Sequence, residues 1–342
     1  MSRLIQIQTN FSVGETDPLI RGRIDLAQYY SALQKATNVT IIPQGGVRRR
    51  PGLRYITELP NTIADDGVVL APFEFSVNDS YMFAIISGRI YVFKNGALIT
   101  NINGSGNNYI TVSAITSAML PDLNWAQSAD TMLFVHEDLA PIKLVRGAND
   151  ASWTVSTISF DFIPKHAFTL TVTQPAATLT ASAKEGTVTL TASAGVFVSG
   201  DVGQYIRIRE GNGFGIARII SVASSTVVTA VTEIPFDKTT AYGSGGWDFE
   251  KGYEDVWSVS RGWPKSVTFH EGRLYFGGSK SRPSTVWGSV VGRFFDFDKG
   301  QSLDDEGIEA TVDTNQFNAI VNCLSGRDLQ FFTTGSEFYV PQ

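Results

Sequence analysis

The sequence predicts a mainly β fold: a partial β-propeller-like array of hairpins, with an inserted small β-barrel and an N-terminal platform segment that carries one helix. Three observations lead to this prediction. The composition is rich in β-branched and aromatic residues and includes 32 glycines, which favours short strands joined by tight turns. A unit of two short strands recurs four times. Between the second and third copies, a long stretch with little charge alternates in the manner of strands.

The N-terminal segment contains the one stretch with convincing helical periodicity, residues 24–37. Its apolar side chains recur at helical spacing, and Asp25 stands where an N-cap is expected. The β-branched run after Asn38 ends the predicted helix. The residues expected on its apolar face are Leu26, Tyr29, Tyr30, Leu33 and Ala36.

Positive charge is concentrated directly after the predicted helix. Arg48, Arg49 and Arg50 stand between a Gly-Gly pair and a Pro-Gly pair, and Arg54 follows. Glycine permits positive φ and proline favours extended geometry before it, so we expect a short, shaped loop between a helix and a strand. Residues 1–55 have a net charge of +5, from eight Lys/Arg and three Asp/Glu, and the rest must carry −11 to give the formal net −6. This segregation predicts an acidic partner for the N-terminal segment.

The four repeated units each contain an apolar strand, a polar turn and another apolar strand. A single hairpin is marginally stable, so the units are expected to stack on one another as in a propeller. The gap between the second and third copies is far longer than the others, which indicates an insertion. The predicted strand pairs are 82–86 with 89–93, 132–135 with 142–145, and 274–276 with 285–287, and the fourth copy spans 326–340.

The insertion, residues 168–235, is dominated by Thr, Ala, Ser and Val, and glycines interrupt its strands. This pattern predicts a small β-barrel or sandwich of five or six strands. The segment 236–257 is expected to be a linker that returns the chain to the hairpin array. The expected parts are a platform or docking segment at 1–60, a first set of hairpins at 61–166, the inserted barrel at 167–246, and a second, incomplete set of hairpins at 247–342.

The sequence contains no recognisable catalytic or metal-binding pattern. The three histidines, His136, His166 and His270, lack metal-ligand spacing to another His, Cys or carboxylate, and the G-x-S-x-G nucleophile motif is absent. The lone Cys323 is expected to be a small buried side chain. We therefore predict that the chain is not an enzyme and that it has no cofactor.

The richest acidic stretch, residues 295–313, lacks the alternating ligands and the closing acid of a calcium loop. Its acids are expected to be solvated loop residues that are candidates for lining an acidic channel. The candidates are Asp304, Asp305, Glu306, Glu309 and Asp313.

Long motifs near both ends of the chain resemble those of a known family. The N-terminal motif combines N-F-x-x-G-E, R-x-D-x-x-x-Y and P-Q-G-G-x-x-R-R-P-G, between Asn10 and Gly52, and the later motifs lie at 261–289 and 304–340. Over nearly the whole chain, the sequence resembles the tail nozzle proteins of short-tailed bacteriophages, also called tail tubular protein B-like proteins. The inserted module is similar to the small β-barrel of the first catalytic cysteine half-domain of ubiquitin-activating enzymes, a likeness of fold that implies no ubiquitin chemistry.

The resemblance implies a structural virion protein, made in the host bacterial cytoplasm and located in the phage tail. Members of the family form a ring, typically hexameric, which docks on an adaptor ring and encloses the channel for DNA ejection. The implied partners are other copies of the chain, the tail adaptor protein and, as further candidates, tail fibres or spikes. Genomic DNA is expected to pass through without specific binding, and the chain is not expected to insert into a membrane. Because the sequence stops just after a repeat strand, where the family continues, we expect it to be truncated at its C-terminus.

The arginines gain a role under this interpretation. We expect them to pair with carboxylates of neighbouring subunits or of the adaptor, since the guanidinium group bonds a carboxylate bidentately. The docking candidates are Arg21, Arg23, Arg48, Arg49, Arg50 and Arg54.

Two other classes of function remain open. A glycan-binding or glycan-cleaving β-propeller, of a phage tail or a cell surface, predicts a pocket with two carboxylates beside an exposed tryptophan. A nucleic-acid-binding protein that uses the arginines predicts an affinity that falls steeply with salt. The acidic net charge of the chain counts against this second class.

Overall fold

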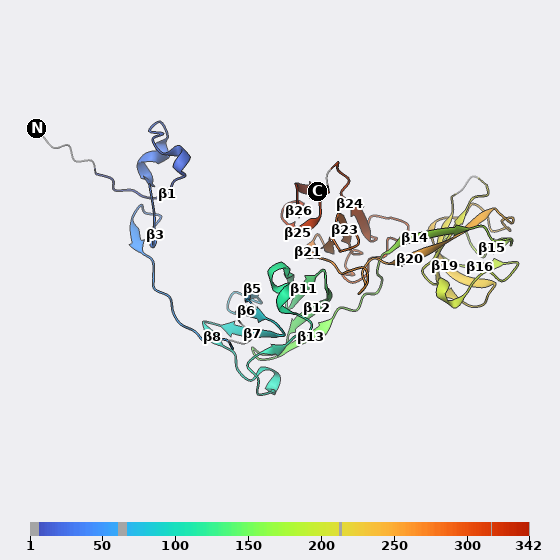
Figure 1. The fold of residues 1–342 in the computed structure, drawn as a ribbon, viewed down its shortest axis with the longest axis horizontal. Coiled ribbons are helices and arrows are strands. Elements are labelled where there is room, and N and C mark those ends of the chain that lie inside the picture. The colour runs from blue at the N-terminus through green and yellow to red at the C-terminus, as the bar shows by residue number, and fades with distance from the viewer. Residues whose placement is uncertain (1–6, 61–66, 212–213, 316, 342) are drawn as a thin grey trace, which may run out of the picture. The chain divides into compact units, whose positions relative to one another are not determined.

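The computed structural model describes residues 7–60, 67–211, 214–315 and 317–341 (Figure 1). The chain divides into two compact units, residues 1–57 and 58–342. The start of the predicted platform, residues 1–6, and the stretch 61–66 beside its predicted end lie outside the described residues. The fold is mainly β, as predicted, and four small antiparallel sheets of the larger unit are arranged like the blades of a propeller.

The smaller unit contains two short strand pairs. Strands β1 (Gly14–Glu15) and β2 (Ala32–Leu33) pair in parallel, and β3 (Val39–Ile41) and β4 (Val47–Arg49) form an antiparallel hairpin. The 3₁₀ helix η1 (Pro18–Ile20) and its longer counterpart η2 (Ala27–Ser31) connect β1 to β2. Among the described residues of this unit, only two glycines are buried, so the unit has almost no core of its own.

The predicted α-helix over residues 24–37 is wrong. Its middle is the five-residue 3₁₀ helix η2, and β2 follows directly because it pairs with β1. Asp25 does not cap a helix, since its carboxylate binds Arg23 with 2.6 Å between Nη2 and Oδ2. Most of the stability of a helix in a protein comes from packing its apolar face. Here that face finds no core, and Tyr29 and Tyr30 are exposed.

The four propeller-like sheets of the larger unit are antiparallel meanders, in which each strand pairs with its neighbour in sequence. The first sheet contains β5 (Val69–Glu74), β6 (Ser80–Ile86), β7 (Arg89–Lys94) and β8 (Ala97–Leu98), with β9 (Ile110–Thr111) also on β7. The second contains β10 (Asn124–Ser128), β11 (Thr131–His136), β12 (Leu139–Arg146) and β13 (Trp153–Thr157). The third contains β21 (Ser266–His270), β22 (Arg273–Gly277), β23 (Thr285–Gly288) and β24 (Ile308–Thr311), and the fourth β25 (Ile320–Ser325), β26 (Leu329–Thr333) and β27 (Glu337–Val340).

The four predicted strand pairs are confirmed, and each forms the second and third strands of its sheet. They correspond to β6 with β7, β11 with β12, β22 with β23, and β26 with β27. The 3₁₀ helices η3 (Ile102–Gly104) and η4 (Ser117–Asp122) lie between the first two sheets in sequence. The repeating unit is therefore a meander, and the apolar pattern of the sequence reveals its second and third strands.

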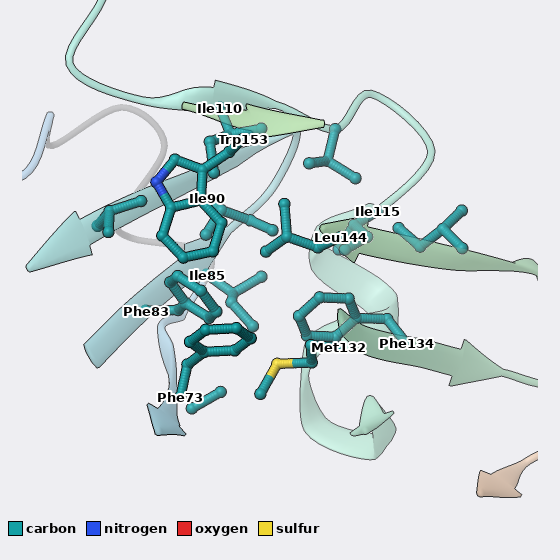
Figure 2. Close-up of a cluster of buried hydrophobic side chains, with 14 of the residues drawn as sticks. Phe73, Phe83, Ile85, Ile90, Ile110, Ile115, Met132, Phe134, Leu144 and Trp153 are labelled. Carbon is teal, nitrogen blue, oxygen red and sulfur yellow. The ribbon is translucent and has the colours of Figure 1, made fainter. Parts of the chain in front are cut away.

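Separate apolar clusters join successive sheets. Figure 2 shows the first, in which Phe73 and Phe83 of the first sheet meet Phe134 and Trp153 of the second. A second cluster joins the second sheet to the third and is centred on Trp257. A third cluster joins the third sheet to the fourth. Each sheet thus buries at least one face against a neighbouring sheet, which is how blades of a propeller are stabilised.

The insertion forms one seven-stranded antiparallel sheet around its own core. Its order is β14 (Lys165–Thr173), β20 (Trp247–Asp255), β17 (Tyr205–Ile208), β18 (Ile216–Val222), β19 (Val227–Ile234), β16 (Thr187–Ala192) and β15 (Leu179–Ala181). The 3₁₀ helix η5 (Ser199–Asp201) precedes β17. Six of these strands, β14 to β19, come from the predicted insertion and agree with the five or six strands expected there, and the seventh is β20.

The predicted linker over residues 236–257 contains β20, so that prediction is wrong. Trp247 and Phe249 belong to the barrel core. Glu250 pairs with Arg207 on β17, and Asp248 pairs with Arg209, which directly follows β17. The two arginines compensate the charge of these acids. Strands β14 and β20 lie side by side, and through them the chain enters and leaves the insertion (Figure 1).

Gly252 permits this two-stranded ribbon to form. Its φ is +97°, and a Cβ atom there would overlap the carbonyl oxygen of Thr169 on β14. We expect Gly252→Ala to lower the unfolding free energy by about 2–4 kcal/mol, from backbone strain and overpacking together. Urea unfolding would measure it. Gly186→Ala is the matched control, because Gly186 has φ +79° but open space around its Cβ position. Equal losses in both variants would contradict the importance of this close approach.

Candidate docking surface

The arginine-rich stretch forms a β-hairpin rather than the predicted loop between a helix and a strand. The turn covers residues 42–46, and the Gly45 N–H donates to the Ile42 carbonyl oxygen at 2.8 Å. Gly45 has φ +92°, and a Cβ atom there would lie 2.6 Å from Asn10 Oδ1, so only glycine fits. Its carbonyl accepts the Phe11 N–H at 2.8 Å, which ties the hairpin to the start of the described chain.

Arg48 and Arg49 lie on strand β4, after the turn. Because successive side chains of a strand point to opposite faces, these two arginines project on either side of the hairpin. Both are exposed, and no carboxylate of a described residue pairs with either. Arg54 lies on the exposed stretch beyond β4, and it also lacks a carboxylate partner among the described residues. Among the described residues of the smaller unit, these three are the arginines without a carboxylate or other hydrogen-bonding partner for the side chain.

The other three predicted docking arginines have partners within the unit. Arg50 donates from Nε to Asn38 Oδ1 at 3.3 Å, and Arg21 donates from Nη2 to the Gln34 carbonyl oxygen at 3.1 Å. Arg23 forms a two-pronged ion pair with Asp25, and its hydrogen bonds lower the pKa of that carboxyl. Arg23 is thus the weakest candidate for binding a carboxylate of another chain.

Large apolar side chains accompany the arginines. Leu19 and Leu53 are each more than nine-tenths exposed, with values of 91% and 92%. Ile24, Tyr30 and Tyr55 are also exposed. Isolated exposed apolar residues are ordinary, but a unit of this size that leaves most of its apolar side chains in solvent presents an interaction surface. Arginine and tyrosine are the residue types enriched at the centres of protein interfaces.

The predicted acidic set does not form a single site. Asp304, Asp305 and Asp313 are exposed, in agreement with solvated loop acids. Glu306 closes its own turn, since Oε2 accepts the Leu303 N–H at 2.8 Å. Glu309 lies on β24 and is bound by two cations, with Lys299 Nζ at 2.7 Å and Arg282 Nη1 at 3.1 Å.

The histidines occupy structural positions. His136 and His270 each end a strand at a hairpin turn, although in different positions within their sheets. No group of three or more His, Cys, Asp or Glu side chains suited to a metal ion occurs among the described residues. Cys323 is buried, as predicted, and burial raises the pKa of its thiol to about 12.

A charged network that sequence reasoning missed surrounds Arg282. Its Nη1 lies 2.5 Å from Nδ1 of His166 on β14, and its Nη2 donates to Thr311 Oγ1 at 3.1 Å. Glu309 binds the same guanidinium group. Arginine can only donate, so His166 Nδ1 must be the unprotonated acceptor. The members are far apart in sequence, so no local spacing could have revealed them.

The contact between Arg282 and His166 predicts that the unfolding free energy depends on pH. Burial and the positive charge of Arg282 lower the pKa of His166. The unfolded chain, with a histidine pKa of about 6.5, then binds the proton more readily than the folded chain, so the unfolding free energy should fall as the pH drops below about 7. His166→Gln keeps an acceptor for Arg282 and does not titrate, so its unfolding free energy should fall less between pH 7 and pH 5. Chemical unfolding at each pH would measure the two slopes, and equal slopes would contradict the prediction.

Comparison of the chain with models of known protein families, and with curated proteins, found no match. No helix in the part of the chain that the structure describes is long and apolar enough to cross a membrane.

Proposed function

We propose that this chain is a structural subunit of the tail nozzle of a short-tailed bacteriophage. In this role, copies of the chain form a ring that docks on an adaptor ring and extends the channel through which DNA leaves. The observation that carries the proposal is the surface of the smaller unit, which combines unpaired arginines with exposed leucines and tyrosines. Most of this surface lies in the stretch whose motifs, from Asn10 to Gly52, resemble the nozzle family.

The described side chains of the smaller unit are only incompletely buried. A unit with almost no buried side chain cannot offset the conformational entropy that its ordering costs, so it needs further contacts. A neighbouring subunit or an adaptor supplies apolar area for Leu19 and Leu53 and carboxylates for Arg48 and Arg49. A contact between different surfaces of identical copies closes into a ring when its rotation permits.

The remaining partners follow from the same proposal. The subunit belongs to the virion tail, is made in the host bacterial cytoplasm, and has tail fibres or spikes as further candidate neighbours. A propeller-like array of rigid sheets suits a mechanical wall, and the role requires no catalytic step or cofactor.

The acidic charge of the body predicts how the assembly treats DNA. Duplex DNA carries one negative charge about every 1.7 Å of its axis, so an acidic channel lets it pass without holding it. We expect the assembled ring to show no retention of a labelled 30-base-pair duplex at low salt. Replacing Asp304, Asp305 and Asp313 with asparagine should increase retention if these acids face the channel. Strong, salt-sensitive binding by the unmodified ring would contradict the acidic channel.

The deciding experiment is the native mass of the particle by light scattering, followed by class averages in the electron microscope. The chain would be measured alone and with its adaptor protein. A ring, or a monomer that becomes a ring with the adaptor, supports the proposal. A monomer that never assembles, even as the full-length protein with tail partners present, overturns it.

A further inference from the structure

A polar groove lies where the first strands of three sheets converge. Strands β10, β21 and β25 approach one another and enclose a hollow of about 500 Å³. This volume falls within the range of roughly 300–1,000 Å³ that ligand pockets occupy. The groove belongs to the larger unit, whereas the docking surface belongs to the smaller unit, and the proposed nozzle role makes no use of the groove.

The groove contains no charged lining residue. Its walls come from Leu, Asn, Trp, Ala, Gln, Val, Thr, Phe and Cys residues, all of them described. The chain has 27 Lys/Arg and 33 Asp/Glu, so a groove of this size without a charged lining residue is a distinctive surface of the molecule. An anionic or cationic ligand would lose its hydration without gaining a counter-charge, so the groove suits a neutral polar ligand.

Side-chain amides and a hydroxyl supply hydrogen-bonding groups in the groove. Asn124 Nδ2 donates to Asn322 Oδ1 at 2.9 Å, which leaves the Asn322 amide donor and the Asn124 carbonyl acceptor available. The same Asn322 oxygen accepts the Cys323 N–H, so the side chain is held in one orientation. Thr268 is only 8% exposed, and its hydroxyl forms no hydrogen bond with any described residue.

Apolar and aromatic groups line the same groove. Trp125 and Phe269 are partly buried lining residues, and Leu324 is 51% exposed. Apolar and aromatic side chains next to paired donors and acceptors match one class of ligand. Pyranose sugars present C–H faces that pack on such surfaces, and neighbouring hydroxyls that both donate and accept.

The groove is also held rigidly. Gln127, at its end, uses its amide on the backbone of the first sheet, since Oε1 accepts the Glu74 N–H at 3.0 Å and Nε2 donates to the Glu74 carbonyl at 2.8 Å. The walls are strands of stiff sheets rather than loops. Rigid elements that position polar groups before binding reduce the entropy cost of holding a ligand.

We propose that this groove binds a neutral saccharide, with Asn124, Asn322 and Thr268 as the hydrogen-bonding residues. It binds without cleaving, because none of the lining residues is a carboxylate and glycoside hydrolysis uses a pair of them. A neutral sugar unit of a bacterial surface polysaccharide and a free sugar share this chemistry. A peptide is the less favoured ligand, since the available groups lie on side chains suited to hydroxyl pairs.

The test is saturation-transfer NMR and calorimetry on the full chain. The neutral probes are maltotriose and N,N′-diacetylchitobiose, the acidic probes are trigalacturonate and 3′-sialyllactose, and an uncharged hexapeptide represents the peptide class. We expect a neutral probe to bind with a Kd of about 1 mM or below, and the acidic probes to bind at least about tenfold more weakly. Polymeric dextran, compared with glucose, distinguishes a polysaccharide from a free sugar as the source.

Variants connect binding to the groove. Asn322→Ala and Thr268→Val should each weaken binding about tenfold, the loss expected for one hydrogen bond, and Thr268→Ser should restore it. Asn107→Ala is the control, since Asn107 is an exposed loop residue that does not line the groove. No binding of any neutral probe, a preference for the acidic probes or the peptide, or equal binding by all variants would overturn the proposal. Ring assembly, measured on the same variants, should not change, so failure here is distinguishable from failure of the nozzle proposal.

Discussion

Replacing Trp153 with alanine is expected to lower the unfolding free energy by about 3–5 kcal/mol, the cost of removing a large buried aromatic side chain. Trp153 is 2% exposed and lies on β13, in the second sheet. Its ring packs edge to face against Phe73, Tyr81 and Phe83 of the first sheet, with centroid distances of 5.3, 5.3 and 5.2 Å. Figure 2 shows Trp153 with Phe73 and Phe83. Its Nε1–H donates to the Asp150 carbonyl oxygen at 2.7 Å, so the truncation also leaves that acceptor without its partner.

This variant tests whether the sheets stabilise one another. Urea unfolding followed by near-ultraviolet circular dichroism would give the free energy and report on aromatic packing. Phe317→Ala is the control, because Phe317 is an aromatic residue that is 73% exposed and should change stability by no more than about 0.5 kcal/mol. If Trp153→Ala cost no more than Phe317→Ala, the cluster between the first two sheets would not be a stabilising core.

The second and third strands of the sheets could be recognised in the sequence because their side chains are mostly apolar, which has a physical reason. Strand β11 is the clearest case. Alternate side chains of residues 132–135 enter the cluster with the first sheet and the cluster with the third, so both faces are covered and the strand is a continuous apolar run in the sequence. Outer strands such as β5 and β24 are less covered than the strands between them. Strand β24, with the sequence IEAT, carries too few apolar residues to be distinguished from a loop.

Two errors in the sequence reading have a common origin. The predicted helix over residues 24–37 and the predicted linker over 236–257 were both judged from local pattern. The α-helix does not form because Ala32–Leu33 pair with β1 and because the smaller unit has no core on which the apolar face of a helix could pack. The acids of β20 are paired across the sheet with Arg207 and Arg209, a compensation visible only once β17 and β20 are adjacent.

For the docking site, the sequence could predict the type of segment but not which of its residues are available. Composition alone indicated an arginine-rich docking segment, but the geometry separated Arg48, Arg49 and Arg54, which lack a carboxylate partner among the described residues, from Arg23, which is neutralised by Asp25. The groove could not be predicted from the sequence, because Asn124 and Asn322 are far apart in the chain. Only the propeller-like arrangement brings Asn124 Nδ2 to 2.9 Å from Asn322 Oδ1.

The double charge reversal Arg48→Glu with Arg49→Glu is expected to prevent ring assembly. If both arginines pair with carboxylates of a neighbour, the change replaces attraction by repulsion at two points of each interface. Losing one partner of a buried charge pair costs about 2–5 kcal/mol, so the association constant should fall by more than about a hundredfold. The monomer should remain folded, because both side chains are exposed and have no ion-pair partner among the described residues.

Light scattering and class averages of the variant, alone and with the adaptor protein, would measure the loss. The matched control is Lys184→Glu with Arg327→Glu, which changes the net charge equally at two exposed positions of the larger unit. Rings that form from the control but not from the β4 variant would place the contact at the hairpin. Loss of assembly in both would instead indicate a dependence on total charge, since self-repulsion grows with net negative charge wherever it is added. Assembly of both variants would remove Arg48 and Arg49 from the interface and leave the exposed leucines and tyrosines as the groups that hold the ring.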